Sequence, residues 1–331
     1  MAGSDQRRFL VTGAFGCIGA WVVRELLERG ERVVGLDLGG DPYRIAMVTP
    51  AGQLGALEQV AGDITDLDTV QRTLDQHAIT NVIHLAALQV PFCRADPPLG
   101  ARVNVVGTVN VFEAVRRRGG MAQVVYASSI AAYDAIDAGS LAADMSALPS
   151  TIYGVFKRAN EGTAHVYWGD HRVSSIGIRP HTVFGPGRDQ GLTSQPTSAM
   201  LAAAAGQPFH MTYGGRSQLQ YAPDVAGAFV AASLAAYEGQ SVHNLAGQAV
   251  HMDEVVTAIE RAEPAATGSI SYDADTLLPF PEQVASGSLA EITLRLPEMA
   301  FDDAVADAVE RFRGLIDRGL ISVGGTGFEP V

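Results

Sequence analysis

Residues 8–19 read RFLVTGAFGCIG and join a short apolar run to a loop with glycines at positions 13, 16 and 19. The run has the composition of a buried strand, and an apolar helical pattern follows the loop. Glycines at this spacing permit a tight turn, close backbone approach to a pyrophosphate, and tight packing of helix on strand. The N–H groups and dipole of the helix would hold the negative charge. The segment therefore predicts a dinucleotide site. Its expected contact residues are Gly13, Phe15, Gly16, Cys17, Ile18 and Gly19.

The same alternation of short apolar runs and helical segments continues to about residue 179. Strands are expected at 8–13, 31–37, 56–62, 80–86, 122–128 and 172–179, and helices at 17–29, 66–77, 99–118 and 150–169. This order predicts an α/β protein with a Rossmann doubly wound parallel sheet, which binds ligands at the carboxyl ends of its strands. Beyond residue 185 the pattern loosens. We expect a dinucleotide-binding domain at 1–184, a smaller C-terminal α/β substrate-binding portion at 185–323 with segments returning to the sheet, and a flexible tail at 324–331.

Composition and charge exclude several classes of protein. The 331 residues are 47% hydrophobic and 18% charged, as in a globular protein with a substantial core. A net charge of −13 argues against a nucleic-acid partner, because an acidic surface repels phosphate backbones. The two cysteines and eight scattered histidines have no metal-ligand spacing, so we expect no metal. The sequence shows neither a signal peptide nor an apolar run long enough for a membrane span, so we expect a cytoplasmic protein without membrane contact.

Residues at the ends of three further strands complete the expected cofactor site. Asp37 ends the second strand, where a carboxylate would bind the ribose hydroxyls and repel a 2′-phosphate. NAD is therefore expected, and the nearby Arg44 leaves NADP as the lesser alternative. Asp63, followed by Ile64, could bond the adenine amino group or cap the next helix, a role that also suits Thr65. After the fourth strand, Leu85, Ala86 and Ala87 would either let the backbone lie against the cofactor or pack in the core.

Tyr153 and Lys157 lie one helical turn apart, on the helix expected after the fifth strand. A tyrosine that acts as a base near neutrality needs a lowered pKa, and a lysine ammonium together with the oxidised nicotinamide cation would favour the phenolate. The fifth strand ends in Ser128 and Ser129, and a hydroxyl at this point could hold the substrate oxygen or simply cap a turn. This combination predicts proton exchange coupled to hydride transfer.

The chain resembles the extended short-chain dehydrogenase/reductases, also called the NAD-dependent epimerase/dehydratase family, over about residues 8–260. The matching segments are TGAFGCIG (12–19), HLAA (84–87), NVVGTVNVFEA (104–114), YASSIAAY (126–133), YGVFK (153–157) and IRPHTVFGPG (178–187). The resemblance implies that Ser129, Tyr153 and Lys157 are catalytic and that Asn104 supports the active-site helix. It also implies that Pro180, Thr182 and Val183 border the nicotinamide. A homodimer through the helices near 99–118 and 150–169 is a further implication.

Departures from the family pattern bear on the reaction and the substrate. Dehydratase members carry Asp-Glu where this chain has Ile130 and Ala131, so dehydration lacks its acid/base pair. Epimerases of nucleotide sugars typically have Asn where His181 and Thr182 stand, and a cation within the segment matching 217–224, which has none here. We therefore expect a sugar, a sugar acid or a similar hydroxy compound. Candidate substrate contacts besides Ser129 are Arg94, His181, Arg188 and Arg216.

Three functions are compatible with this site. The first is an NAD-dependent dehydrogenase that oxidises a secondary alcohol, with Tyr153 as acid/base. The second is a (nucleotide-)sugar epimerase that keeps NAD bound and returns the hydride to the other face. The third is a non-catalytic NAD(P) sensor, which would have no need for a matched serine, tyrosine and lysine.

Overall fold

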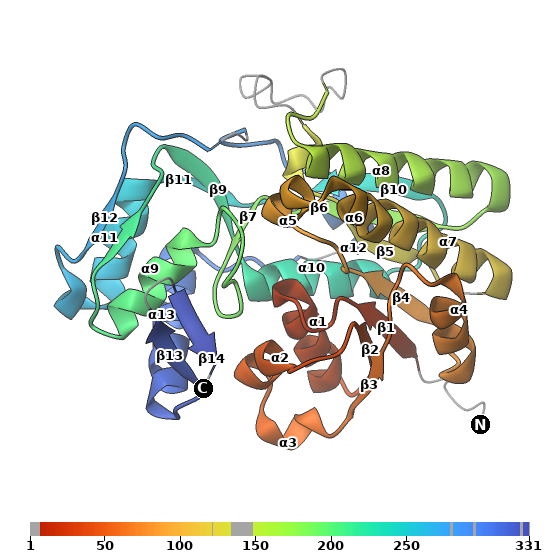
Figure 1. Ribbon diagram of the computed structural model, residues 1–331, viewed down its shortest axis with the longest axis horizontal. Coiled ribbons are helices and arrows are strands. Elements are labelled where there is room, and N and C mark those ends of the chain that lie inside the picture. The colour runs from red at the N-terminus through yellow and green to blue at the C-terminus, as the bar shows by residue number, and fades with distance from the viewer. Residues whose placement is uncertain are drawn as a thin grey trace.

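The computed structural model describes residues 7–120, 122–133, 148–278, 281–293, 296–324 and 327–330. Its centre is a seven-stranded sheet in the order β10-β6-β5-β4-β1-β2-β3, and every pair in it is parallel. The strands are β1 (Arg8–Thr12), β2 (Arg32–Asp37), β3 (Leu57–Ala61), β4 (Asn81–His84), β5 (Val124–Ala127), β6 (Ser175–Arg179) and β10 (Gln240–Asn244). The predicted Rossmann fold is confirmed (Figure 1).

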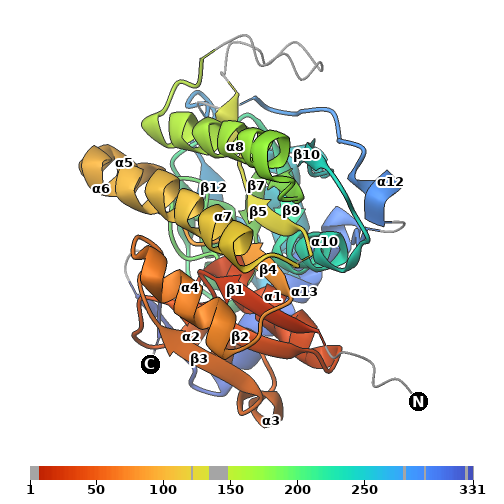
Figure 2. The ribbon, with the colours of Figure 1, turned by 90° about the vertical axis from the view of Figure 1, so that its right-hand side faces the viewer.

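Helices cover both faces of this sheet because its strands are apolar on both sides. Along β1, Leu10 packs with the helices α4 (Leu67–Gln76), α7 (Gly107–Arg118) and α8 (Ile152–His171). Its neighbours Phe9 and Val11 point the other way, as successive strand residues must, and pack with α1 (Cys17–Glu28) and α10 (Ala222–Leu234). Figure 2 shows α7 and α8 side by side along one flank.

The remaining chain forms a smaller α/β layer beside the carboxyl ends of the strands (Figure 1). It contains a three-stranded sheet, β11-β9-β7, and a two-stranded sheet, β12-β8. Its elements are β7 (Thr182–Phe184), α9 (Gln195–Ala204), β8 (Phe209–Met211), β9 (Arg216–Tyr221), β11 (Gln248–His251), α11 (Met252–Ala262), β12 (Ile270–Tyr272) and α13 (Phe301–Asp317), whereas α12 (Leu289–Thr293) packs on α10. Two elements of this half, α10 and β10, lie on the large sheet. The domain boundary expected near residue 185 stays a prediction.

Several elements differ from those expected. The expected helix 99–118 is divided into the end of α6 (Pro97–Ala101), a π-helical turn at Arg102–Val106, and α7, and α5 (Val90–Ala95) precedes α6. Prolines occupy the first turns of α5 and α6, where their missing N–H groups cost nothing. Short helices α2 (Tyr43–Val48) and α3 (Ala51–Leu54) follow β2, and both were missed.

The end of the chain forms two paired strands, and the flexible tail expected at 324–331 stays a prediction. Strand β13 (Ile321–Gly324) pairs antiparallel with β14 (Gly327–Pro330). No helix in the described ranges is long and apolar enough to cross a membrane.

Candidate active site

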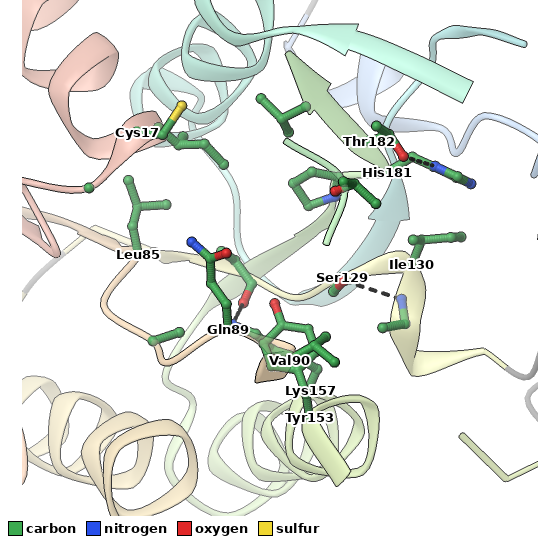
Figure 3. A pocket seen from close by; sticks show the side chains of 18 of the residues that line it. Cys17, Leu85, Gln89, Val90, Ser129, Ile130, Tyr153, Lys157, His181 and Thr182 are labelled. Atoms are coloured by element: carbon green, nitrogen blue, oxygen red, sulfur yellow. Dashed lines mark hydrogen bonds between the residues drawn. The ribbon is translucent and has the colours of Figure 1, made fainter. Parts of the chain in front are cut away.

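A cleft lies at the carboxyl ends of the parallel strands, between the large sheet and the smaller layer. Its walls come from the loops after β1, β4, β5 and β6, from the first turns of α8, and from Arg188, Leu192 and Thr193. Figure 3 shows Cys17 and Leu85 on one side of it, His181 and Thr182 on another, and Tyr153 with Lys157 on a third. In doubly wound sheets, ligands bind at the carboxyl ends of the strands, which is where this cleft lies.

The glycine loop has the geometry of a diphosphate cradle. Gly13 has φ +69°, and a Cβ there would lie 2.6 Å from the backbone nitrogen of Ala86. A Cβ at Gly19 would lie 2.1 Å from the carbonyl oxygen of Gly13, so no larger residue fits at the helix–loop contact. No side chain caps α1, and Gly16, Cys17 and Ile18 line the cleft at its start. The loop therefore presents helix N–H groups to a ligand, as a dinucleotide requires.

Phe15, Asp37 and Arg44 are not among the residues that line the cleft, and the side chains of Asp37 and Arg44 both bond the backbone of Phe15 in the glycine loop. The Oδ2 of Asp37 accepts a hydrogen bond from the N–H of Phe15 at 2.9 Å, which places the carboxylate beside the glycine loop. Arg44 instead binds both carboxylate oxygens of Asp189 and the carbonyl oxygen of Phe15. Its guanidinium is therefore engaged by an anion of the protein, which removes the sequence-based argument for a 2′-phosphate at this position.

Asp63 and Ile64 are not among the residues that line the cleft. The Oδ1 of Asp63 accepts a hydrogen bond from the N–H of Thr65 at 2.8 Å. The prediction that Asp63 or Thr65 caps the next helix was wrong. The cap of α4 is Asp66, whose side chain accepts a hydrogen bond from the N–H of Asp68. Ile64 is buried, and its side chain fills the space where Gly107 lacks a Cβ.

The loop after β4 forms one wall of the cleft, and Asn104 fixes its shape. Leu85 and Ala87 line the cleft, whereas Ala86 packs against Gly13. The buried Asn104 accepts from the N–H of Leu88 at 2.7 Å and donates to its carbonyl oxygen at 2.9 Å. Asn104 therefore supports this wall of the cleft through Leu88 and does not line the cleft itself.

A buried histidine that the sequence did not single out supports the same wall. His84 bonds Thr12 through Nδ1 at 2.7 Å and Thr108 through Nε2 at 3.0 Å. Thr108 donates its own proton to the carbonyl oxygen of Asn104, so it accepts from His84. Burial lowers the pKa of His84 to about 3, so the ring is neutral. The chain of contacts ties the end of β1 to the end of β4.

Ser129, Tyr153 and Lys157 meet at the floor of the cleft (Figure 3). The phenol oxygen of Tyr153 points toward the side chain of Ser129 (Figure 3). The buried Lys157 donates from Nζ to the carbonyl oxygen of Ala127 at 2.7 Å, and Nζ lies 5.5 Å from the centre of the Tyr153 ring. The neighbouring Ser128 donates instead to the buried Glu161. Of the two strand-end serines, Ser129 is thus the one that faces Tyr153.

The pKa values of this pair differ from the expectation. Burial raises the pKa of Tyr153 to about 12, against the lowering effects of the Ser129 hydroxyl and the charge of Arg188. Burial also lowers the pKa of Lys157 to about 8. The lowered phenol pKa expected from Lys157 is therefore not found in the protein alone, since desolvation outweighs the nearby charges.

The four residues after β6 all line the cleft: Pro180, His181, Thr182 and Val183. The Nε2 of His181 donates to the carbonyl oxygen of Pro281 at 2.6 Å, and its Nδ1 lies 3.2 Å from the hydroxyl of Thr182. Burial lowers the pKa of His181 to about 4. The ring is neutral and held in place, so it presents a fixed wall to the cleft rather than a charge.

Of the three arginines predicted to contact substrate, the structure brings only Arg188 to the cleft. Arg94 lies exposed on α5. Arg216 is exposed on β9, where it bonds the carbonyl oxygen of Ala249 and pairs with Glu254. The sequence reasoning also missed several lining residues: Gln89, Val90, Pro91, Leu192 and Thr193. Gln89 to Pro91 directly continue the HLAA segment, and that adjacency was the available signal.

Comparison with known proteins places this site in context. Residues 9–246 match the model of the "NAD dependent epimerase/dehydratase family". A UDP-glucose 4-epimerase of Mycolicibacterium smegmatis is 33% identical over 77% of this chain and 82% of its own length. UDP-glucuronate 4-epimerase 2 of Arabidopsis thaliana is 33% identical over 54% of this chain, and the match spans only 42% of the plant protein. The structure of Thermus thermophilus UDP-glucose 4-epimerase in complex with NAD is 26% identical, covers 93% of this chain and 99% of its own, and has a TM-score of 0.75.

Proposed function

The chain belongs to the NAD-dependent epimerase/dehydratase family, and we propose that it is an NAD-dependent oxidoreductase that transfers hydride at a secondary alcohol or ketone. The observation that carries this proposal is the meeting of Ser129, Tyr153 and Lys157 at the floor of a cleft whose wall is a glycine cradle. A non-catalytic sensor would need the cradle alone.

The proposed mechanism assigns one task to each side chain. Ser129 holds the substrate oxygen, and Tyr153 takes the hydroxyl proton while the carbon-bound hydrogen leaves as hydride. Lys157 binds the nicotinamide ribose and adds positive charge beneath the phenol. The oxidised nicotinamide supplies the hydride acceptor and a cation that favours the phenolate. Burial raises the pKa of Tyr153, so the phenolate that accepts the proton depends on the positive charges of Lys157 and the oxidised nicotinamide.

The substrate is proposed to be a sugar, a sugar acid or a similar hydroxy compound. Within the described residues, the cations that line the cleft are Lys157 and Arg188, which is few for an enzyme that must grip a dinucleotide and a nucleotide sugar together. The names of the relatives favour a second candidate, an epimerase of UDP-sugars that keeps NAD bound through turnover. Both candidates use the same three side chains.

One assay separates the two candidates. The protein is mixed with NAD and a panel of sugars, sugar acids, UDP-glucose and UDP-glucuronate, while absorbance at ~340 nm and product stereochemistry by NMR are followed. We expect NADH to accumulate with one member of the panel. An epimer formed without net absorbance change would instead establish the epimerase, and no conversion with Tyr153 intact would count against both.

The cofactor preference is expected to depend on the charge of Asp37. In Asp37→Asn an oxygen remains to accept from the N–H of Phe15, but the anion is lost. Affinity for NAD should fall by about tenfold or more, and discrimination against NADP should shrink, because a charge-assisted hydrogen bond and a repulsion disappear together. Calorimetric titration with both dinucleotides measures the change. Asp41→Asn, an exposed neighbour, is the control, and an unchanged NAD/NADP ratio in Asp37→Asn would contradict the assignment.

We also propose a homodimer through α7 and α8, which lie side by side (Figure 2). Large apolar side chains are exposed along these helices and the segment leading into α7: Phe92, Leu99, Val106, Ile152, Val155 and Val166. Exposed apolar residues grouped in this way are typical of an interface. The double variant Val155→Glu/Val166→Glu should elute as a monomer in light-scattering chromatography. Leu277→Glu, exposed elsewhere, should not change the mass, and a monomeric wild type would refute the proposal.

A further inference from the structure

We infer that Arg188, with Gln89 and Thr193, forms a binding site for an oxyanion inside the cleft. The inference rests on the proposed function, because it assigns this site to either the cofactor or the substrate of that reaction. The chemical class is a carboxylate or a phosphate oxygen. Two ligands could supply this oxyanion in the cleft: a substrate through a carboxylate, or the dinucleotide through its diphosphate.

The guanidinium of Arg188 is held by neutral groups. Its Nη1 lies 3.3 Å from the Oε1 of Gln89, its Nη2 lies 3.0 Å from the hydroxyl of Thr193, and its Nε is buried without a partner. Among the described residues, no carboxylate forms a salt bridge with it and none lines the cleft, although the chain has 36 acidic residues. A partly buried cation without a counter-charge is costly unless a ligand supplies one.

The next residue could have supplied that charge, and the fold directs it elsewhere. The carboxylate of Asp189 is bound by Arg44 at 2.7 Å and by the hydroxyl of Tyr43. These contacts tie the segment carrying Arg188 to α2 and leave the Arg188 guanidinium facing the cleft. The carboxylate of Asp189 therefore binds within the protein, and the guanidinium of Arg188 remains available to a ligand.

The backbone around Arg188 is shaped to make room for it. Gly185, Gly187 and Gly191 have φ values of +116°, +91° and +97°, which residues with a side chain rarely adopt. A Cβ on Gly191 would lie 2.3 Å from the Oε1 of Gln89 and 3.2 Å from the Nη2 of Arg188. Because residue 191 has no side chain, Gln89 and Arg188 can approach each other beside it.

The site lies within electrostatic reach of both reacting partners. The charge of Arg188 acts to lower the pKa of the Cys17 thiol, at the start of α1, and that of Tyr153, across the cleft. An oxyanion bound here would therefore be near the helix N-terminus that is proposed to hold the diphosphate, and near the phenol that is proposed to face the substrate.

Direct binding measurements test the site without requiring turnover. The wild type, Arg188→Gln and Arg188→Lys are titrated calorimetrically with NAD, and their NAD-saturated forms with malonate as a carboxylate probe. We expect Arg188→Gln to weaken one of the two ligands by tenfold or more, and Arg188→Lys to weaken it less. Loss of NAD affinity identifies the diphosphate as the source, and loss of malonate affinity alone identifies a substrate carboxylate.

Arg216→Gln is the matched control, because Arg216 is exposed and outside the cleft. Thermal denaturation checks that each variant is folded. If Arg188→Gln does not fold, Gln89→Met removes the acceptor that orients the guanidinium and should weaken the same ligand by about threefold. The inference is overturned if neither NAD nor malonate binds these variants more weakly than it binds Arg216→Gln. Failure of the hydride-transfer proposal would appear separately, as normal binding without turnover.

Discussion

Replacing Tyr153 by phenylalanine is expected to lower kcat by about a hundredfold to ten-thousandfold while NAD binds unchanged. A positioned acid or base contributes a factor of this size, and the phenol oxygen is the group assigned to that task. Phenylalanine keeps the ring, and with it the contact to the Lys157 ammonium 5.5 Å from the ring centre. Only the phenol oxygen, which faces the side chain of Ser129, is lost. The cradle residues Gly13, Gly16 and Gly19 are untouched.

Tyr167→Phe is the matched control for this experiment. Tyr167 is on the same helix, and its hydroxyl bonds Glu113 at 3.2 Å, away from the residues that line the cleft. Steady-state rates and calorimetric NAD titrations are compared for both variants. We expect Tyr167→Phe to turn over within about threefold of the wild type, since a partly exposed hydrogen bond contributes little. Tyr153→Phe that turns over within tenfold of the wild type would refute its role as acid/base.

Features that depend on short sequence spacing were predictable. The glycine loop and the Tyr153–Lys157 pair are local patterns, in which neighbouring residues determine the geometry of a turn or a helix face. The same holds for the parallel sheet, because each strand and its following helix can be read within one window. The structure confirms the fold and brings these residues to one cleft.

Features that depend on contacts across the chain were not predictable. Arg94, Arg188 and Arg216 are equivalent in sequence terms, and only the fold separates the first and last, which are exposed, from Arg188. Strands β7 and β8 could not be predicted either, because a strand of three residues is too short to show an alternating pattern of apolar residues. The pKa of Tyr153 belongs to the same class. The sequence spacing indicates that Lys157 lies near Tyr153. The desolvation that raises the pKa of Tyr153 arises instead from all the residues packed around the phenol.

Replacing Glu161 by alanine is expected to lower the free energy of unfolding by about 3–5 kcal/mol, the largest stability effect that we predict. Glu161 accepts from the Nε and the Nη2 of Arg179, each at 2.7 Å, and from the hydroxyl of Ser128. Both ionic side chains are less than a tenth exposed, at 8% and 7%. Removing the carboxylate takes this ionic partner from the buried Arg179 guanidinium, which also donates to the hydroxyl of Tyr133 at 2.6 Å.

Urea and thermal unfolding measure the effect, which corresponds to a fall in Tm of about 4–7 °C for a chain of this length. Glu113→Ala is the matched control, because Glu113 also binds two arginines, Arg116 and Arg117, but does so on the surface of α7. Exposed pairs contribute about 1 kcal/mol or less, so the control should be nearly neutral. Equal losses in the two variants would show that burial of the Glu161–Arg179 pair adds nothing. A larger loss in Glu161→Ala would show that the buried pair, which also binds Ser128 after β5, stabilises the fold.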